Sequence, residues 1–514
     1  MTSLAIDLHR ISKFANYTIP FLSVLFFILG SNVSFYFHFL TVAFLFLTIV
    51  NFFYLKVQTE HALLRNFGFL AQGRYIIESI GPELRQYLYA SDTEERPFNR
   101  SERAEIYRKA KDIDSASSFG SLKDFDTSEI KIRHSLYPRD QEDLTPYSLT
   151  FGEERGIKNT FTITSPLIIS AMSYGALGEH AVRALARGAK LAGIPMNTGE
   201  GGFPKHHLKE DCNLIFQMGT AKFGVRGEEG NLDDQKLKEL VSHEQIKMIE
   251  IKLSQGAKPG KGGLLPKEKI TKEIAELRGV PMDKDVISPP HHNECKDKAT
   301  TVAFLRKVQE VSSLPVGLKL CVGSFTEVKA LVQEMIDQDT FPDYISIDGS
   351  EGGTGAAPKA VMDRVGVPLY PALSGVNKIL CKAGVRDRLK LLASGKLVNP
   401  GRQMLAFALG AQAIYSARGF MMAMGCIQTL QCGNNTCPVG ITTHDRSLQK
   451  GLDIGAKSIR IKNYVQNIEH DLSELLSATG QKTFESLTMK NLYVPEDSTL
   501  APLLDNTTRQ LSNL

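Results

Sequence analysis

The sequence predicts an α/β protein, a (β/α)8 TIM barrel preceded by a two-helix transmembrane hairpin and a helical linker. Two observations predict this fold. No Asp, Glu, Lys or Arg occurs between Lys13 and Lys56. From about residue 166 to residue 425, short runs rich in Val, Ile and Leu alternate with segments of helical composition. The predicted divisions are residues 1–56 for the hairpin, 57–143 for the linker, 144–494 for the barrel and 495–514 for a C-terminal tail.

The uncharged N-terminal stretch has the length of two membrane-spanning helices. A span needs about 20 apolar residues, and residues 17–33 and 35–55 form two such runs around a turn at residues 30–34. A signal peptide and a buried globular hairpin are the alternatives, but a second apolar run follows where a cleavage site would stand. Both flanks are basic and the turn is not, which predicts that both ends, and the barrel, are cytoplasmic.

The linker is highly charged, and residues 78–89 and 100–112 have the composition of amphipathic helices. The overall charge is nearly balanced, with 60 basic and 56 acidic residues and a net charge of +4. We therefore expect no nucleic acid partner. The seven cysteines are an odd number in a long chain, which argues against a secreted disulphide framework.

Eight apolar runs predict the barrel strands, at residues 166–172, 194–199, 214–219, 248–254, 316–322, 344–350, 389–395 and 413–419. An open doubly wound sheet is the alternative. The barrel is favoured because a glycine-rich or polar cluster follows nearly every run, and in a barrel these ends converge on one face.

The converging loops predict a site for a flavin mononucleotide. Their glycines allow close approach of the backbone to a planar ligand, and the last two loops of such barrels frequently bind phosphate. Lys319 lies inside an apolar strand and needs a partner, which could be a protein group or the flavin ring. The candidate cofactor residues on these loops are Asn197, Gly352, Gly353, Gly355, Ser394, Gly395, Arg418 and Gly419.

Three cysteines, Cys426, Cys432 and Cys437, lie within residues 426–437 and are followed by a proline. This clustering is typical of an iron–sulphur cluster. A zinc site with His444 is the main alternative, although structural zinc sites usually place cysteines in closer pairs. Buried inert cysteines are the third interpretation. The isolated cysteines are expected to be core residues, namely Cys212, Cys295, Cys321 and Cys381.

Several motifs together resemble the synthase domain of glutamate synthase over roughly residues 144–494. They are N-T-G-E-G-G, I-K-L-S-Q-G-A-K-P-G, I-S-P-P-H-H, E-G-G-T-G-A and the C-x5-C-x4-C-P-V-G signature. With the hairpin included, the chain resembles the stand-alone FMN-binding glutamate synthase family proteins of bacteria.

This resemblance implies FMN, a 3Fe–4S cluster on the three cysteines, and 2-oxoglutarate or its imine as the substrate of the reference enzyme. It implies substrate contacts at Lys252, Gln255, Lys258 and Arg278, and FMN contacts at Ser173, Gln217 and Lys319. The implied catalytic residues are Glu200, Lys258 and Lys319.

Three departures from the family pattern affect the functional prediction. We expect no N-terminal glutaminase domain, because Thr2 follows Met1 and no such domain comes after it. We also expect the C-terminal glycine-repeat domain to be missing. The usual K-P-G-E-G-G has Lys261 at its glutamate position. Ammonia is therefore expected from solution or from a separate partner.

Three functions follow as hypotheses. The first is reductive amination of 2-oxoglutarate, through 2-iminoglutarate, to glutamate, with electrons from a donor protein or carrier. The second is a membrane-tethered flavin oxidoreductase that acts on another amino or 2-oxo acid and exchanges electrons with a membrane or soluble carrier. The third is a non-catalytic flavin-binding membrane protein.

Overall fold

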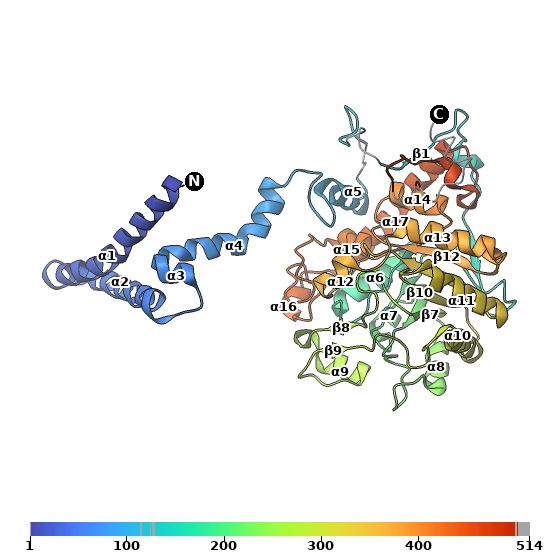
Figure 1. Ribbon diagram of the computed structural model, residues 1–514, viewed down its shortest axis with the longest axis horizontal. Helices are drawn as coiled ribbons and strands as arrows, with labels where there is room; N and C mark the ends of the chain where they lie inside the picture. The colour runs from blue at the N-terminus through green and yellow to red at the C-terminus, as the bar shows by residue number, and fades with distance from the viewer. Residues whose placement is uncertain (1, 114–115, 124, 126–128, 499–500, 502–514) are drawn as a thin grey trace. The chain divides into compact units, whose positions relative to one another are not determined.

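The chain folds as two units, Met1–Arg100 and Ser101–Leu514 (Figure 1). The first unit is helical and the second is built on a parallel barrel. The computed structural model describes residues 2–113, 116–123, 125, 129–498 and 501.

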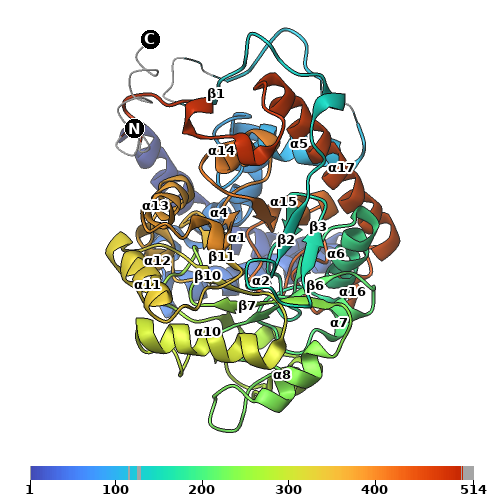
Figure 2. The ribbon, with the colours of Figure 1, turned by 90° about the vertical axis from the view of Figure 1, so that its right-hand side faces the viewer.

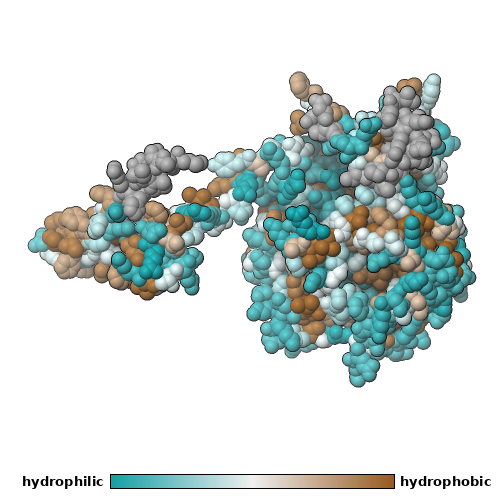
Figure 3. Space-filling model, in the orientation of Figure 1, coloured by the Kyte–Doolittle hydropathy of each residue, from teal (hydrophilic) through white to brown (hydrophobic). Residues whose placement is uncertain are grey.

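The first unit begins with a helical hairpin of α1 (Thr2–Asn32) and α2 (Phe37–Phe52). The segments Ile11–Asn32 and Phe37–Val57 are each long and apolar enough to cross a membrane. The ring of Phe26 stacks on the rings of Phe37 and Phe44 and holds the two helices together. Hydrophobic side chains cover much of the outer surface of this hairpin (Figure 3).

The turn of the hairpin begins later than the sequence predicts. Helix α1 continues to Asn32, so the first three residues of the predicted turn at 30–34 are helical. The side chains of Ser31 and Asn32 donate to the carbonyl oxygens of Phe27 and Ile28, at 3.0 and 2.9 Å. These hydrogen bonds satisfy carbonyl groups within the last turns of the helix, which keeps that stretch wound.

Five shorter elements complete the first unit. They are the π-helix η1 (Phe53–Val57), α3 (Ala62–Phe67), the 3-10 helix η2 (Gly68–Ala71), α4 (Gln72–Leu84) and the π-helix η3 (Arg85–Tyr89). The predicted linker helix at residues 78–89 therefore corresponds to the end of α4 and η3, and the one at residues 100–112 corresponds to α5 (Arg100–Ala110).

Eight parallel strands close into a barrel in the second unit, and the last strand pairs with the first. They are β4 (Leu167–Ile169), β5 (Met196–Asn197), β6 (Leu214–Met218), β7 (Ile246–Lys252), β10 (Val316–Leu320), β11 (Tyr344–Asp348), β12 (Lys390–Ser394) and β13 (Ala413–Ser416). Each lies within one of the eight predicted runs or overlaps it. The (β/α)8 prediction is confirmed, and the open sheet is wrong.

Helices surround the strands (Figure 2). They are α6 (Glu179–Ala192), α7 (Lys205–Leu208), α8 (Asp234–Val241), α9 (Lys272–Arg278), α10 (Lys298–Ser312), α11 (Phe325–Asp337), α12 (Lys359–Arg364), α13 (Leu369–Lys382), α14 (Pro400–Ala408), α15 (Arg418–Met424), α16 (Arg446–Gln449) and α17 (Ile454–Ala478). Short polar side chains cap many of them. Asp297 and Thr300, for example, form a capping box at the start of α10.

Three small antiparallel pairs stand outside the barrel. They are β1 (Lys131–Ile132) with β14 (Leu492–Tyr493), β2 (Leu149–Phe151) with β3 (Phe161–Ile163), and β8 (Leu264–Leu265) with β9 (Val286–Ile287). The remaining 3-10 turns are η4 (Gln141–Asp143), η5 (Lys267–Lys269), η6 (Arg386–Arg388), η7 (Phe484–Ser486) and η8 (Met489–Asn491).

The β2–β3 hairpin closes one end of the barrel. Leu149, Phe151 and Ile163 are buried in one core cluster with strand residues such as Ile168 and Met248. Other members of this cluster, Ile215, Met248 and Tyr344, lie in the first halves of β6, β7 and β11, so the hairpin covers the N-terminal end. The carboxyl ends of the strands meet at the opposite end, which we call the barrel mouth, and in this fold that end carries the active site.

Candidate active site at the barrel mouth

The loop after β5 and the end of β7 bring Glu200 and Lys252 together at the barrel mouth. Nζ of Lys252 donates to Oε1 of Glu200 at 2.7 Å and to Oε1 of Gln255 at 2.5 Å. Glycines make room for the carboxylate, because a Cβ on Gly219 or Gly263 would lie 2.4 or 2.7 Å from its oxygens. Two predicted substrate-binding residues, Lys252 and Gln255, and one predicted catalytic residue, Glu200, therefore form one hydrogen-bonded group.

Lys258 and Arg278 approach the same carboxylate from the loop after β7 and from α9. Nζ of Lys258 donates to the carbonyl oxygen of Ala356 at 3.0 Å, and an Nη of Arg278 donates to the carbonyl oxygen of Tyr174 at 2.9 Å. Both side chains are buried. The Nε–H of Arg278 has no hydrogen-bond partner within the described part of the chain, so this donor is available to a ligand.

The four ionisable groups at the mouth perturb one another. Burial and the charge of Lys252 lower the pKa of Lys258 to about 8, against the opposing effect of the Glu200 carboxylate. Burial also lowers the pKa of Arg278 to about 10. Burial alone would raise the pKa of Glu200, but the charges of Lys252, Lys258 and Arg278 outweigh it and hold that pKa below its usual value. Three cations thus face one carboxylate, which leaves an excess of two positive charges.

Asn197 and Gln217 meet at a carboxylate inside the barrel. The amide nitrogens of Asn197 and Gln217 donate to Oε1 of Glu250, at 2.8 and 2.7 Å. The Glu250 side chain is fully buried on β7, and its second oxygen has no hydrogen-bond partner in the regions that the structure describes. The structure therefore brings two predicted cofactor residues together and fixes their orientation through a third residue.

Lys319 has an acidic partner on the neighbouring strand. Its Nζ lies 3.7 Å from Oδ2 of Asp348, which is too long for a hydrogen bond. The same Asp348 oxygen accepts the N–H of Gly256 at 2.9 Å. The Lys319 ammonium is also 5.9 Å from the centre of the Tyr415 ring. The buried charge is thus compensated, but the ammonium retains donor hydrogens for a ligand.

A hollow at the ends of β12 and β13 holds most of the predicted phosphate-binding residues. It is lined by Gly352, Gly353, Ser394, Gly395, Lys396, Leu397, Val398, Tyr415, Ser416, Ala417 and Arg418. The hydroxyl of Ser416 is buried there and lacks a hydrogen-bond partner among the described residues. Glycine backbone, a hydroxyl and two basic side chains suit a phosphate group.

Three other predicted cofactor residues lie outside the lining of this hollow. Gly419 is inside α15, where a Cβ would lie 2.5 Å from the Tyr464 hydroxyl. Gly355 borders the cysteine loop, because a Cβ on Gly433 would lie 3.3 Å from its carbonyl oxygen. Ser173 is buried, and its backbone packs against the loop after β5.

The three clustered cysteines lie on the loop that follows α15, which we call the cysteine loop (residues 426–437). Cys437 is buried, and Cys426 and Cys432 are partly exposed. Burial, together with the charge of Cys437, raises the pKa of Cys426 to about 11 and also raises the pKa of Cys432. The three thiols therefore lie within electrostatic range of one another.

The surroundings of Cys437 suit a thiolate. Burial alone would raise its pKa, but hydrogen bonds from Thr442 and from the backbone of Ile441 and Val439 lower it below the usual value. Amide N–H groups aimed at sulphur are the partners that tune iron–sulphur ligands. The buried Thr442 hydroxyl has no conventional partner within the described residues. The side chains present thus fit a sulphur-ligated cluster.

The alternative zinc site would need the cysteines and His444 to meet at one point. No group of three or more His, Cys, Asp or Glu side chains within the described residues is arranged to hold a metal ion. The Nε2 of His444 is hydrogen-bonded to the carbonyl oxygen of Gly175 at 2.9 Å. A single ion needs all its ligands at one point, whereas a cluster spreads its thiolates over different irons.

Lys269 connects the cysteine loop to the barrel mouth. Its side chain is buried, and Nζ donates to the carbonyl oxygens of Ala176 and Cys432, the latter at 3.2 Å. Burial lowers its pKa to about 8, and the Cys432 and Cys437 thiols oppose that shift. Among the described residues, these thiols are the acidic groups that act on it most strongly.

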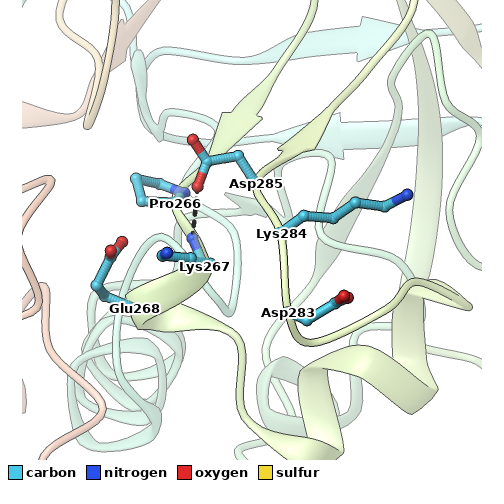
Figure 4. A pocket seen from close by; sticks show the side chains of 6 residues that line it. All are labelled: Pro266, Lys267, Glu268, Asp283, Lys284 and Asp285. Atoms are coloured by element: carbon cyan, nitrogen blue, oxygen red, sulfur yellow. Dashed lines mark hydrogen bonds between the residues drawn. The ribbon is translucent and has the colours of Figure 1, made fainter.

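A second hollow lies away from these residues, beside the β8–β9 hairpin (Figure 4). It is lined by Pro266, Lys267, Glu268, Asp283, Lys284 and Asp285. The backbone N–H of Lys267 donates to Oδ1 of Asp285 at 2.9 Å. Its lining includes none of the predicted site residues, and its charged side chains are typical of a solvated surface.

The comparison with known families covers both the barrel mouth and the cysteine loop. The conserved region in glutamate synthase matches residues 100–482. The chain belongs to the glutamate synthase family. The matched region contains all eight barrel strands, the four ionisable residues of the mouth and the three clustered cysteines. Membership places the chain among the glutamate synthase-like oxidoreductases, as the sequence motifs predict.

Individual relatives differ in how much of their length is shared. The glutamate synthase large subunit-like protein YerD of Bacillus subtilis (strain 168) is 39% identical over 461 residues, which cover 82% of this chain and 88% of that protein. The archaeal-type glutamate synthase (NADPH) of Thermotoga neapolitana is 36% identical over 327 residues, 63% of this chain and 61% of that protein. A crystal structure of mandelate oxidase matches with a TM-score of 0.43 and 16% identity, over 76% of this chain and 97% of that one.

Sequence reasoning missed several residues that the structure brings into these sites. Glu250 gives the same signal as Lys319, because it is a charged residue in the middle of an apolar strand. Ser416 ends a strand beside the predicted phosphate loop. Lys269 and Thr442 carry no comparable signal, since only the fold brings them to the cysteines.

Proposed function

We propose that the chain is an FMN- and iron–sulphur-dependent oxidoreductase that converts 2-oxoglutarate, through 2-iminoglutarate, to glutamate. The observation that carries the proposal is the charge at the barrel mouth. Lys252, Lys258 and Arg278 all act on Glu200, the carboxylate that the three share within the described residues, and the excess of two positive charges in this group complements a dicarboxylate. A monocarboxylate would leave one buried cation without a counter-charge, which is costly.

The three cations come from separate segments, the end of β7, the loop after it and α9. Such an arrangement can hold both carboxylates of one ligand and fix its C2 atom. Arg278 supports this role because its Nε–H is buried without a partner among the described residues, and a guanidinium binds a carboxylate in a defined geometry.

The ionisable residues also supply the proton transfers that the reaction needs. Ammonia condenses with the 2-oxo carbon with loss of water, and the imine then gains a hydride at C2 and a proton on nitrogen. Lys258, with a pKa of about 8, can donate that proton near neutral pH. Glu200 is held ionised and can accept a proton from an incoming ammonium ion.

The cofactors are assigned to the two sites described above. The FMN phosphate would occupy the hollow with Ser394, Gly395, Ser416 and Arg418, and Lys319 would face the flavin ring. The 3Fe–4S cluster would be held by the cysteine loop. When bound, FMN supplies the reducing equivalents for the imine carbon and the cluster supplies electrons to FMN.

The hairpin would anchor the enzyme in a lipid bilayer, with both of its ends and the barrel on the cytoplasmic side. Two apolar helices of suitable length support this location. An electron-donor protein or carrier and a source of ammonia, either free or from a separate partner, complete the reaction.

The test uses the full chain, purified anaerobically and loaded with FMN and iron. It is incubated with 2-oxoglutarate, 15N-ammonium and reduced methyl viologen, and glutamate is measured by mass spectrometry. We expect 15N-glutamate from the wild type and from Lys284→Met, a control at an exposed lysine, and strongly reduced formation by Lys258→Met and Arg278→Met. Absence of labelled glutamate from fully loaded wild type would exclude this reaction, and amination of a different oxo acid in a parallel panel would favour the second hypothesis.

A further inference from the structure

Helix α4 carries an apolar stripe that is exposed among the described residues of the first unit. Ile76, Ile77 and Ile80 are 60%, 62% and 46% exposed. Together with Leu84 they follow the i, i+1, i+4, i+8 spacing that places side chains on one face of a helix. The stripe continues into η3, where Leu88 is 69% exposed.

The opposite face of α4 is polar and solvated. Arg74 and Glu78 form an exposed ion pair at 2.7 Å. Ser79 is exposed as well and lies outside the stripe, about 120° around the helix from its centre. A helix with one exposed apolar face and one charged face is typical of segments that lie in the plane of a membrane interface.

Hydrogen bonds fix the beginning of α4 to the open end of the hairpin. Gln72, the first residue of α4, donates to the Tyr54 hydroxyl at 2.6 Å. The N–H of Phe69 donates to the side chain of Asn51, which itself donates to Asn16 at 3.0 Å. This is the end at which the apolar segment Phe37–Val57 stops.

We propose that α4 lies in the interface of the same bilayer that the hairpin spans, with its isoleucine stripe at the acyl boundary and Arg74 and Glu78 in water. The proposal rests on the proposed membrane insertion of the hairpin. Lipid is the proposed partner because α4 leaves the hairpin at the level where the apolar segments end, which brings its exposed stripe to the depth of the headgroup region.

The absence of tryptophan from the chain allows a direct test, because a single introduced tryptophan is the only one in the protein. Three variants of the full chain are compared in phosphatidylcholine–phosphatidylglycerol vesicles. Ile80→Trp probes the stripe, Ser79→Trp is the matched control one residue earlier and outside the stripe, and Phe46→Trp in α2 probes the hairpin itself.

Quenching by lipids brominated near the headgroup or deep in the acyl chain, and by aqueous iodide, reports the depth of each tryptophan. We expect deep quenching for Phe46→Trp, shallow quenching with blue-shifted emission for Ile80→Trp, and iodide quenching for Ser79→Trp.

Equal iodide quenching of Ile80→Trp and Ser79→Trp would overturn the proposal. Blue-shifted emission of Ile80→Trp without quenching by bromine would also overturn it, because the stripe would then be covered by protein. If Phe46→Trp is not quenched by either lipid, the membrane insertion of the hairpin fails, and the inference about α4 fails with it.

Discussion

The pH dependence of oxo-acid binding tests the assignment of Lys258 most directly. Only its ammonium form attracts a carboxylate, and its pKa is about 8. Roughly nine tenths of the lysine is therefore charged at about pH 7, and roughly one tenth at about pH 9. Affinity for 2-oxoglutarate should fall about tenfold as the pH rises between these values, while Arg278, with a pKa of about 10, remains mostly charged.

The assay is calorimetric titration of the full chain with 2-oxoglutarate at fixed ionic strength and several pH values. Binding of the dianion favours the ammonium form, so it should take up protons above about pH 8, which buffers of different ionisation enthalpy detect. Lys258→Met should bind weakly at every pH, and Lys284→Met should follow the wild type. A wild-type affinity that does not change with pH, or a Lys258→Met variant that keeps the slope, would refute the reasoning.

Three further predictions each concern one substitution and the contact that it removes or creates. Lys269→Met removes the buried cation beside the cysteine loop. The midpoint potential of the proposed cluster should therefore fall by on the order of 100 mV in an EPR-monitored redox titration, and an unchanged potential would contradict this. Gly256→Ala should lower the free energy of unfolding by about 1–3 kcal/mol and lower the Tm, because its Cβ would lie 1.7 Å from the Gly349 carbonyl oxygen. The control Gly323→Ala, whose Cβ meets no atom within 4 Å, should have the Tm of the wild type. Lys319→Met should lower the flavin midpoint potential in spectroelectrochemistry, since a cation that favours the anionic reduced ring is lost; an equal potential would place Lys319 away from the flavin.

The barrel could be predicted from the sequence because its strands are buried on both sides. Parallel strands that are buried on both faces have short, continuous apolar sequences, which differ clearly from those of the helices between them. Even the two-residue strand β5 lies inside such a run. The hairpin turn was less predictable. Gly30, Ser31 and Asn32 favour a turn by composition, but the two polar side chains bond back to helix carbonyls, and these contacts outweigh the propensity.

The site was partly predictable for a similar reason. Lys319 could be found because a charge inside an apolar strand is costly without a partner. The roles of Asn197 and Gln217 could not be read so directly, because both donate to Glu250. That contact depends on three strands meeting inside the barrel. Lys269 is separated from Cys432 by 163 positions in the chain, so no local pattern could link them.

The same lysine suggests that the two sites affect one another. Lys269 contacts the carbonyl oxygen of Ala176, two residues from Tyr174, whose carbonyl oxygen accepts a hydrogen bond from Arg278. The charge of Arg278 also lowers the pKa of Lys269, so the cations of the mouth and the cysteine loop lie within electrostatic range. A bound dianion should therefore make addition of an electron to the proposed cluster less favourable.

The coupling has a definite sign and is reciprocal, because it is a free energy shared by two equilibria. Saturating 2-oxoglutarate should shift the midpoint potential of the cluster to a more negative value, and reduction of the cluster should weaken 2-oxoglutarate binding by the equivalent factor. EPR-monitored redox titrations with and without the oxo acid measure the first effect, and Arg278→Met, which removes the ligand contact, should abolish it. Identical potentials in the presence and absence of a bound oxo acid would show that the carbonyl contacts of Lys269 are structural and transmit no charge effect between the mouth and the cysteine loop.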